Sequence, residues 1–345
     1  MSILNDLLRA AKRRGLEVRG RSASGAIDGR RVSLGVDTAS RNGESVAVRA
    51  YLDPPLDLGL TLRARVVASV LEFDHVTGHP DLDGEFTITG DEPARVRAFL
   101  AGPLGDAAAA LYRASFDLRI DDTGCTIYVL VGFAVPDDDW FDRAVDSAVK
   151  LANLVDAQRV HLDPAEPLKP HAAVLRALAD RRALSFSTTP LVTSGIVEGR
   201  PIFIAAQRTG RRKHHLFARA AIAGDLGIGL SVRRQHLLDD VRTFLGGQDV
   251  IVGDAPFDKR FVIGAKPDRA HLVGRLLDAE TRAALLAIDA RCGPIRLDDH
   301  GIRVDPIPLH HPAEDLAWLA DTLTEVTGRV SRNLVRGGAD AGPYR

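Results

Sequence analysis

The hydrophobic positions of this chain follow two periods, one typical of strands and one typical of helices. Short runs of apolar and β-branched residues indicate strands at 45–52, 58–66, 85–90, 215–222, 228–234 and 260–264. Leucine, valine and phenylalanine return at three- and four-residue steps after Pro93 and again after Pro267. This spacing predicts amphipathic helices, each opened by a proline in its first turn.

Each half of the chain is predicted to close with a hairpin and a helix. The hairpins lie at 118–132 and 295–307, where an Asp-Asp pair and a glycine form the turn. The closing helices carry apolar faces over Phe141–Ala152 and Leu316–Val330. The pattern per half is α-ββββ-β-α-ββ-α, which predicts an α+β fold with an antiparallel sheet packed by helices.

The second half of the chain repeats the first. The segment SGAIDGRRVSL at 24–34 matches SGIVEGRPIFI at 194–204, an offset of 170 residues (194 − 24). Matching blocks then follow in the same order, pairing 58–63 with 228–233, 78–88 with 253–263, and 118–124 with 295–301. Blocks that keep one order indicate a tandem duplication of one domain. We therefore expect residues 16–155 and 184–334 to share one topology.

The boundary between the copies is predicted from composition. Residues 157–170 contain DPAEPLKP, a proline-rich run without hydrophobic period, which is typical of a stiff linker. The first α+β repeat is then 1–156 and the second is 171–335. Residues 336–345 lack apolar periodicity, and we expect a mobile tail.

A motif in the second copy resembles a pattern found in uncharacterised bacterial domains. The motif is FDKRFVI at 257–263, followed by a helix and by IRLDDHGIRV at 295–304. In those domains a G-x-x-x-G-R-type hairpin precedes an F-D-x-x-F-x-V strand, a helix with a Leu-Leu pair and a closing β-hairpin. The resemblance covers most of residues 190–330. Residues 20–155 match the pattern less well, with Leu82 at the position equivalent to Phe257. It implies a fold and no reaction.

Charge and composition narrow the classes of function. The 45 basic and 46 acidic side chains give a formal charge of −1, so no global field attracts a nucleic acid, and none is expected as a partner. Apolar stretches such as 128–135 are far shorter than a membrane span, so no membrane is expected either. Cys125 and Cys292 lack the spacing of a disulfide framework or a zinc site. With no apolar core in the first eighteen residues, we expect a cytoplasmic protein.

Acidic candidates for catalysis have simpler interpretations. The Asp-Asp pairs at 121–122 and 298–299 stand just before a glycine, where turn chemistry favours aspartate. Asp83 and Asp258 are expected to cap local backbone N–H groups. A catalytic or ligand-binding role for these carboxylates is the alternative.

The histidines and the hydroxyl side chains are also poor candidates for metal ligands and catalytic nucleophiles. His75 and His79 with Asp74 and Asp81 fit no standard metal-ligand spacing, and the second copy keeps neither histidine. His310 and His311 are adjacent, and side chains of an extended chain point apart, which disfavours chelation. No serine lies in a nucleophile elbow. We therefore predict no catalytic residue, no cofactor and no metal.

Basic residues are the remaining candidates. The densest cluster is QRTGRRKHH at 207–215, for which a solvated loop is the first interpretation and an anion or partner contact the second. Both copies also keep arginine at two strand positions, Arg49 and Arg63 in the first and Arg219 and Arg233 in the second. Either these side chains cover the sheet with their heads paired to acids, or they line a surface for an anionic partner. The candidate contact residues are Arg208, Arg211, Arg212, Lys213, His214, Arg219 and Arg233.

These observations favour a noncatalytic cytoplasmic binding or scaffolding protein. Its partner is expected to be another protein or a second copy of the chain, of unknown identity. The alternative is an enzyme or small-ligand sensor with a pocket at the interdomain cleft, because catalytic sites assembled from distant residues leave no local motif.

Overall fold

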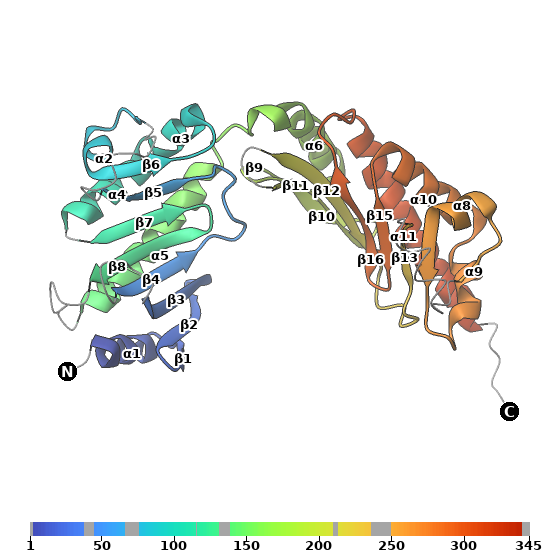
Figure 1. The fold of residues 1–345 in the computed structure, drawn as a ribbon, viewed down its shortest axis with the longest axis horizontal. Helices are drawn as coiled ribbons and strands as arrows, with labels where there is room; N and C mark the ends of the chain where they lie inside the picture. Colours follow the sequence, from blue (N-terminus) through green and yellow to red (C-terminus); the bar gives the residue numbers. More distant parts are fainter. Residues whose placement is uncertain are drawn as a thin grey trace. The chain divides into compact units, whose positions relative to one another are not determined.

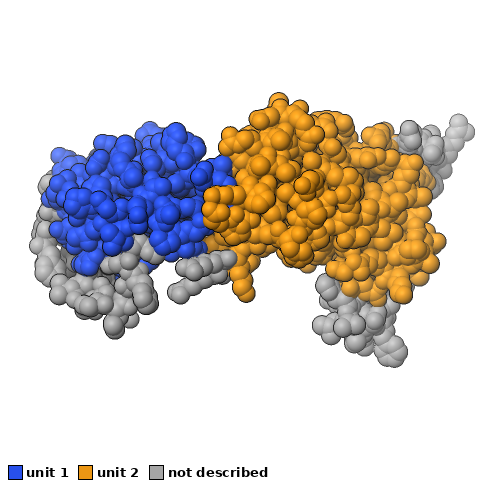
Figure 2. Space-filling model, turned by 90° about the horizontal axis from the view of Figure 1, so that it is seen from above, with its two compact units in different colours: residues 1–165, 188–190 blue, residues 166–187, 191–345 orange. Residues whose placement is uncertain are grey.

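The computed structural model describes residues 3–37, 45–65, 76–114, 116–130, 139–209, 213–235 and 250–339 of the 345-residue chain. The chain divides into two compact units, coloured separately in Figure 2. Unit 1 comprises residues 1–165 and 188–190, and unit 2 comprises residues 166–187 and 191–345. The duplication seen in the sequence therefore corresponds to two structural units.

Unit 1 is an antiparallel sheet with helices packed on it (Figure 1). The described strands pair in the order β1-β2-β3-β4-β8-β7-β5-β6. Its elements are α1 (Ile3–Arg13), β1 (Glu17–Arg19), β2 (Ser22–Ile27), β3 (Arg30–Asp37), β4 (Ser45–Tyr51), β5 (Thr61–Ala64), α2 (Pro80–Glu85), β6 (Phe86–Thr89), α3 (Pro93–Leu100), α4 (Pro103–Arg113), β7 (Asp117–Asp121), β8 (Gly124–Leu130) and α5 (Trp140–Arg159).

Unit 2 has the same plan. Its described strands pair in the order β9-β10-β11-β12-β16-β15-β13-β14. Its elements are η1 (Glu166–Leu168), α6 (Lys169–Arg182), β9 (Ser185–Thr188), β10 (Leu191–Val197), β11 (Arg200–Arg208), β12 (His214–Ala221), β13 (Ser231–Arg234), α8 (Ala255–Arg260), β14 (Phe261–Gly264), η2 (Ala270–Leu272), α9 (Val273–Leu276), α10 (Ala279–Arg291), β15 (Ile295–Asp298), β16 (Gly301–Ile307) and α11 (Asp315–Ala339).

The two sheets have one topology. Replacing β1 to β8 by β9 to β16 in the order of the first sheet gives the order of the second, with every pair antiparallel. The predicted α+β tandem fold with a shared topology is confirmed. Both β2-β3 and β10-β11 turn through two residues of positive φ, Asp28 (51°) with Gly29 (75°) and Glu198 (49°) with Gly199 (77°). Such turns match the twist of a hairpin and fix its register.

Strand alternation builds the core of each unit. In β4 the buried side chains are Val46, Val48 and Ala50, and α5 packs against this strand. In β12 the buried side chains include Leu216 and Ala218, and α11 packs against it. Each fully buried valine or leucine stabilises the fold by about 1.5–3 kcal/mol. The other face of each sheet is left to the alternate, largely polar positions.

Several elements differ from the sequence-based prediction. The edge strands β1 and β9 are short and were not predicted, because runs of three or four residues carry little periodicity. The segment predicted as an FDxxFxV strand begins as the short helix α8, which contains Phe257 and Asp258, and only then becomes β14. The equivalent α2 precedes β6 in unit 1.

The helices after the two prolines also differ. Pro93 opens α3 as predicted, but the helix ends at Leu100, and Pro103 opens α4 after a break at Gly102, where φ is 75°. Pro267 opens no helix: a turn and the 3₁₀ segment η2 follow it. The main helix α10 begins instead at Ala279, after the N-cap Asp278, whose carboxylate accepts the N–H of Thr281.

Helices extend into both the predicted linker and the predicted tail. Helix α5 continues to Arg159 and α6 begins at Lys169, so both reach into the predicted linker at 157–170. Helix α11 continues to Ala339, inside the predicted tail, and 340–345 lie outside the described residues. Within the described ranges, no helix has the length and apolar character needed to cross a membrane.

A glycine at the same position in both units allows two paired strands to approach closely. A Cβ atom added to Gly301, the first residue of β16, would lie 2.4 Å from the carbonyl oxygen of Ala220. At the equivalent Gly124 it would lie 2.6 Å from the carbonyl oxygen of Ala50. Neither strand pair can accept a side chain at this position without moving backbone.

We predict that Gly301→Ala lowers the free energy of unfolding by about 1–3 kcal/mol, because overpacking forces strands apart. Urea denaturation followed by circular dichroism measures the change. Gly264→Ala is the matched control: its added Cβ would meet nothing closer than Ser231 Cβ at 3.8 Å, so a change within about 1 kcal/mol is expected. Equal effects of the two substitutions would contradict the close approach.

Candidate functional site

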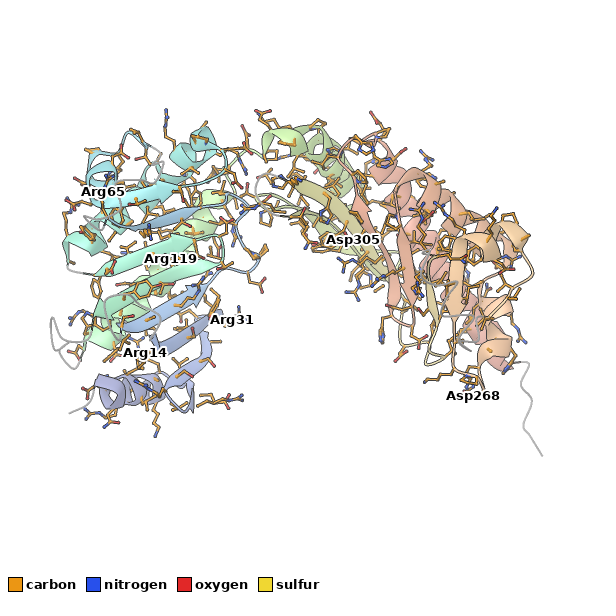
Figure 3. The ribbon with its side chains drawn as sticks, in the orientation of Figure 1. Arg14, Arg31, Arg65, Arg119, Asp268 and Asp305 are labelled. Carbon is orange, nitrogen blue, oxygen red and sulfur yellow. The ribbon has the colours of Figure 1, made fainter. Side chains whose placement is uncertain are left out.

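The second sheet carries its charge on the face turned away from the core. In β12, Leu216 and Ala218 are buried, and the alternate residues Phe217 and Arg219 point to the opposite face. We call this the polar face of unit 2. Figure 3 labels Asp305 on β16, which belongs to the same face. In unit 1, Figure 3 labels Arg119 on β7, which holds the position of Arg296 on β15.

Strand pairing aligns four arginines across the polar face of unit 2. Arg219 in β12 lies opposite Arg303 in β16. Arg303 lies opposite Arg296 in β15, and Arg296 lies opposite Arg233 in β13. Neighbouring strands are about 4.8 Å apart, so the four Cα positions span about 14 Å. We call Arg219, Arg303, Arg296 and Arg233 the arginine row.

The arginine row is only partly neutralised. Arg303 pairs with Asp305 at 2.6 Å, and the same carboxylate lies 3.1 Å from Nε2 of His215. Arg219 and Arg296 are exposed and have no ion pair or hydrogen bond within the described part of the chain. Like charges directly opposite each other in a sheet are destabilising. Arg219 and Arg296 therefore each keep a positive charge beside Arg303, which an anion from outside can compensate.

The surroundings of the row form a recess with an aromatic border. Pro294, Arg296, Arg303 and Asp305 line a partly open pocket of about 240 Å³. The guanidinium of Arg303 lies 5.1 Å from the ring centroid of Phe217. The arrangement can bind a carboxylate or phosphate oxygen through the planar fork of arginine.

Unit 1 keeps three of the four arginines and pairs two of them with one carboxylate. The equivalent positions are Arg49, Thr126, Arg119 and Arg63 across β4, β8, β7 and β5. The carboxylate of Asp121 lies 2.9 Å from Arg49 and 3.2 Å from Arg119. Asp121 also accepts the backbone N–H of Thr123 in its own turn. The corresponding Asp298 accepts the N–H groups of His300 and Gly301 and has no ion pair with an arginine among the described residues. The two copies thus differ in how their arginines are balanced.

The structure separates the basic residues that the sequence grouped as candidates. Arg208 and His214 lie opposite each other in β11 and β12, at positions in phase with the buried Ile204 and Leu216 and therefore on the side of the sheet opposite to Arg219. Lys213 is exposed at the end of the hairpin, and Arg211 and Arg212 lie outside the described residues. Only Arg219 and Arg233 belong to the arginine row.

Sequence analysis missed the two central members of the row. Arg296 and Arg303 flank the turn of the β15-β16 hairpin, and their pairing follows from a two-residue turn at Asp299 and His300. Polar and apolar residues alternate in IRLDDHGIRV, and a two-residue turn within this segment would have paired Arg296 with Arg303 on one face. The repeat comparison overlooked Arg303 because unit 1 has Thr126 there.

The Asp-Asp pairs are turn residues, as predicted. Asp121 and Asp298 accept N–H groups within their own turns. Their neighbours reach further: Asp299 accepts the N–H groups of Gly229 at 2.7 Å and Leu230 at 2.8 Å. Asp122 accepts those of Gly59 and Leu60 at 2.9 Å in unit 1. We call this contact the carboxylate clamp. It ties the hairpin turn to the loop before β13 or β5.

Asp83 and Asp258 cap local backbone, which confirms their predicted role. Asp258 accepts the N–H groups of Val252, Gly253 and Asp254. Asp83 accepts those of Thr77 and Gly78. These bonds and that of the Thr77 hydroxyl lower the pKa of Asp83, although burial of the carboxyl opposes them.

The histidine candidates do not gather into a metal site. Nε2 of His79 lies 3.1 Å from Asp106, Asp81 pairs with Arg113, and Asp74 and His75 lie outside the described residues. The expectation that His310 and His311 point apart is wrong, because they lie in a turn and their rings stack with centroids 4.9 Å apart. In the described part of the chain, no three His, Cys, Asp or Glu side chains lie close enough to hold a metal ion.

The cysteines are free, buried thiols. Burial raises the pKa of Cys125 to about 12 and that of Cys292 to about 11. Both thiols are therefore protonated near neutral pH. A thiolate nucleophile needs the opposite shift.

We predict that Asp299→Ala lowers the free energy of unfolding by about 1–3 kcal/mol, because two backbone N–H groups lose their acceptor. Chemical denaturation measures the change. Asp268→Ala is the control, since this carboxylate is 71% exposed and should change stability by less than about 0.5 kcal/mol. A silent Asp299→Ala variant would show that the carboxylate clamp is dispensable.

His171 predicts an acid-dependent loss of stability. It is buried in α6, and burial lowers its pKa, with Glu314 and the backbone of His311 and Pro167 opposing. The unfolded chain therefore binds this proton more readily, so stability falls as the pH drops below about 6.5. Melting temperatures at about pH 7.5 and 5.5 should differ less in His171→Gln than in the wild type. Identical differences would exclude His171 as the source.

Comparison with known proteins assigns no relationship to this chain. No protein-family model, curated protein or solved structure matches it. The resemblance to bacterial domains through the FDKRFVI motif stays a prediction. The geometry of the chain's own residues therefore carries the functional argument.

Proposed function

We propose that this chain is a noncatalytic cytoplasmic binding protein that holds an anionic partner on the polar face of unit 2. The observation that supports the proposal most directly is the arginine row, in which Arg219 and Arg296 are exposed and unpaired among the described residues. Arg219 and Arg296 lie on the two sides of Arg303 in neighbouring strands, and like charges placed opposite each other repel. A bound anion relieves that repulsion.

The kind of side chain also favours binding. Arginine presents several N–H donors in a rigid plane and can bind an oxyanion through two parallel hydrogen bonds. Arginine and aromatic residues are enriched at the centres of protein interfaces. Phe203 lies directly opposite Arg219 in the neighbouring strand, and its ring lies 5.5 Å from that of Phe217. Aromatic and arginine side chains thus share one face.

The thiol chemistry agrees with a noncatalytic role. Cys125 and Cys292 are buried, with raised pKa values, so neither is suited to nucleophilic attack. Free thiols are also what a reducing compartment maintains, which supports the cytoplasm as the proposed location.

The double variant Arg219→Gln, Arg296→Gln tests the proposal. Removing two mutually repelling charges should leave the melting temperature unchanged or slightly higher, while partner binding falls. The control is Arg181→Gln, Arg275→Gln, which removes the same charge from exposed helix positions. Quantitative mass spectrometry of proteins captured from source-cell lysate compares the three forms.

Two results would contradict the proposal. A clear fall in melting temperature in the Arg219, Arg296 variant would assign these arginines a structural role. Equal capture of every protein by this variant and by the wild type would show that the arginine row binds no partner. Loss in this variant alone, with the control unaffected, is the expected result.

A further inference from the structure

Resting on this proposed function, we infer that the arginine row receives an acidic, extended polypeptide segment of a partner protein. The segment crosses the strands of unit 2 and presents carboxylates to Arg219, Arg303, Arg296 and Arg233. An apolar residue at one end contacts Phe203. The class of ligand follows from the chemistry, spacing and border of the row.

Unit 1 shows which anion the arrangement accepts. There the carboxylate of Asp121 lies within 3.2 Å of both Arg49 and Arg119, which occupy the positions of Arg219 and Arg296. The first copy thus contains its own acidic side chain at its arginines. In the second copy the described contacts of Asp298 are with the N–H groups of its own turn alone, which leaves the exposed Arg219 and Arg296 for a carboxylate from outside.

The spacing of the row matches an extended chain. Its four strands span about 14 Å, and side chains on one side of an extended polypeptide recur every 6.6–6.8 Å, roughly. Three acidic residues at alternate positions therefore cover the row from Arg219 to Arg233. Asp305 already occupies one side of Arg303, so the incoming carboxylates are directed mainly to Arg219 and Arg296.

The net charge of the chain favours a protein segment over a nucleic acid. Beyond Arg219 the polar face carries Phe203, which is 37% exposed, and Ile196, which is 68% exposed. Ile196 favours contact with an aliphatic side chain, whereas the ring of Phe203 can stack on a base or pack against an apolar side chain. The formal charge of −1 also gives no long-range attraction for a polyanion. Short-range pairing with a few carboxylates remains favourable.

Fluorescence anisotropy with the full chain tests the inference. The probe is a labelled peptide of about ten residues, in which a leucine is followed at alternate positions by three glutamates, with serines between them. The matched control peptide has glutamine in place of each glutamate. Oligothymidylate of about twelve nucleotides is the competing class of anion.

The glutamate peptide should bind the wild type at least about tenfold more tightly than the glutamine peptide, because charge-assisted hydrogen bonds are lost in the latter. Arg219→Gln, Arg296→Gln should weaken the glutamate peptide by a similar factor. Arg181→Gln, Arg275→Gln should bind it as the wild type does. Melting curves confirm that the variants are folded.

Other outcomes overturn the inference and separate it from the proposed function. Tighter binding of oligothymidylate, lost in the Arg219, Arg296 variant, would replace the polypeptide by a nucleic acid and leave the arginine row as a binding surface. Equal binding of both peptides, or of the glutamate peptide by all variants, would exclude carboxylate recognition by the row. Failure of both probes to bind the wild type would overturn this inference, and lysate capture would then decide the proposed function separately.

Discussion

The carboxylate clamp is the interaction on which the geometry of each unit depends. In unit 2 the turn residue Asp299 receives two backbone N–H groups from the loop that leads into β13. This contact holds the β15-β16 hairpin and β13 in one register, although Asp299 follows Gly229 and Leu230 by 70 and 69 residues in the sequence. The alignment of Arg303, Arg296 and Arg233 follows from that register. A shift of one residue would send alternate side chains to the core.

Much of the fold could be predicted from the sequence because its signals are local or repeated. The duplication, the closing hairpins at 118–132 and 295–307 and the amphipathic faces after Pro93 were all predicted from the sequence. The edge strands β1 and β9 were not, because a strand of three or four residues is stabilised by pairing and not by its own pattern. Pro267 was misread because the main helix starts at a better cap, Asp278, further along the chain.

The candidate site could be predicted only in part. Arg219 and Arg233 emerged because both copies retain arginine there, whereas Arg296 and Arg303 become neighbours only once β15 and β16 take their places in the sheet. Residues that lie close to Arg219 in the sequence were grouped with it, although the fold separates them. Arg208 and His214 lie close to Arg219 in sequence, but they face the other side of the sheet. Strand alternation, and not sequence distance, decides which charges act together.

Each unit carries its own carboxylate clamp and its own close glycine contact. Polar-face residues such as Arg219 and Arg296 take no part in either contact. The residues that maintain the backbone geometry are therefore different from the residues that set the exposed charges, and selection can act on the two sets separately. After duplication, one copy could lose or gain a charge and acquire a new specificity, while the sites that maintain its architecture stayed unchanged.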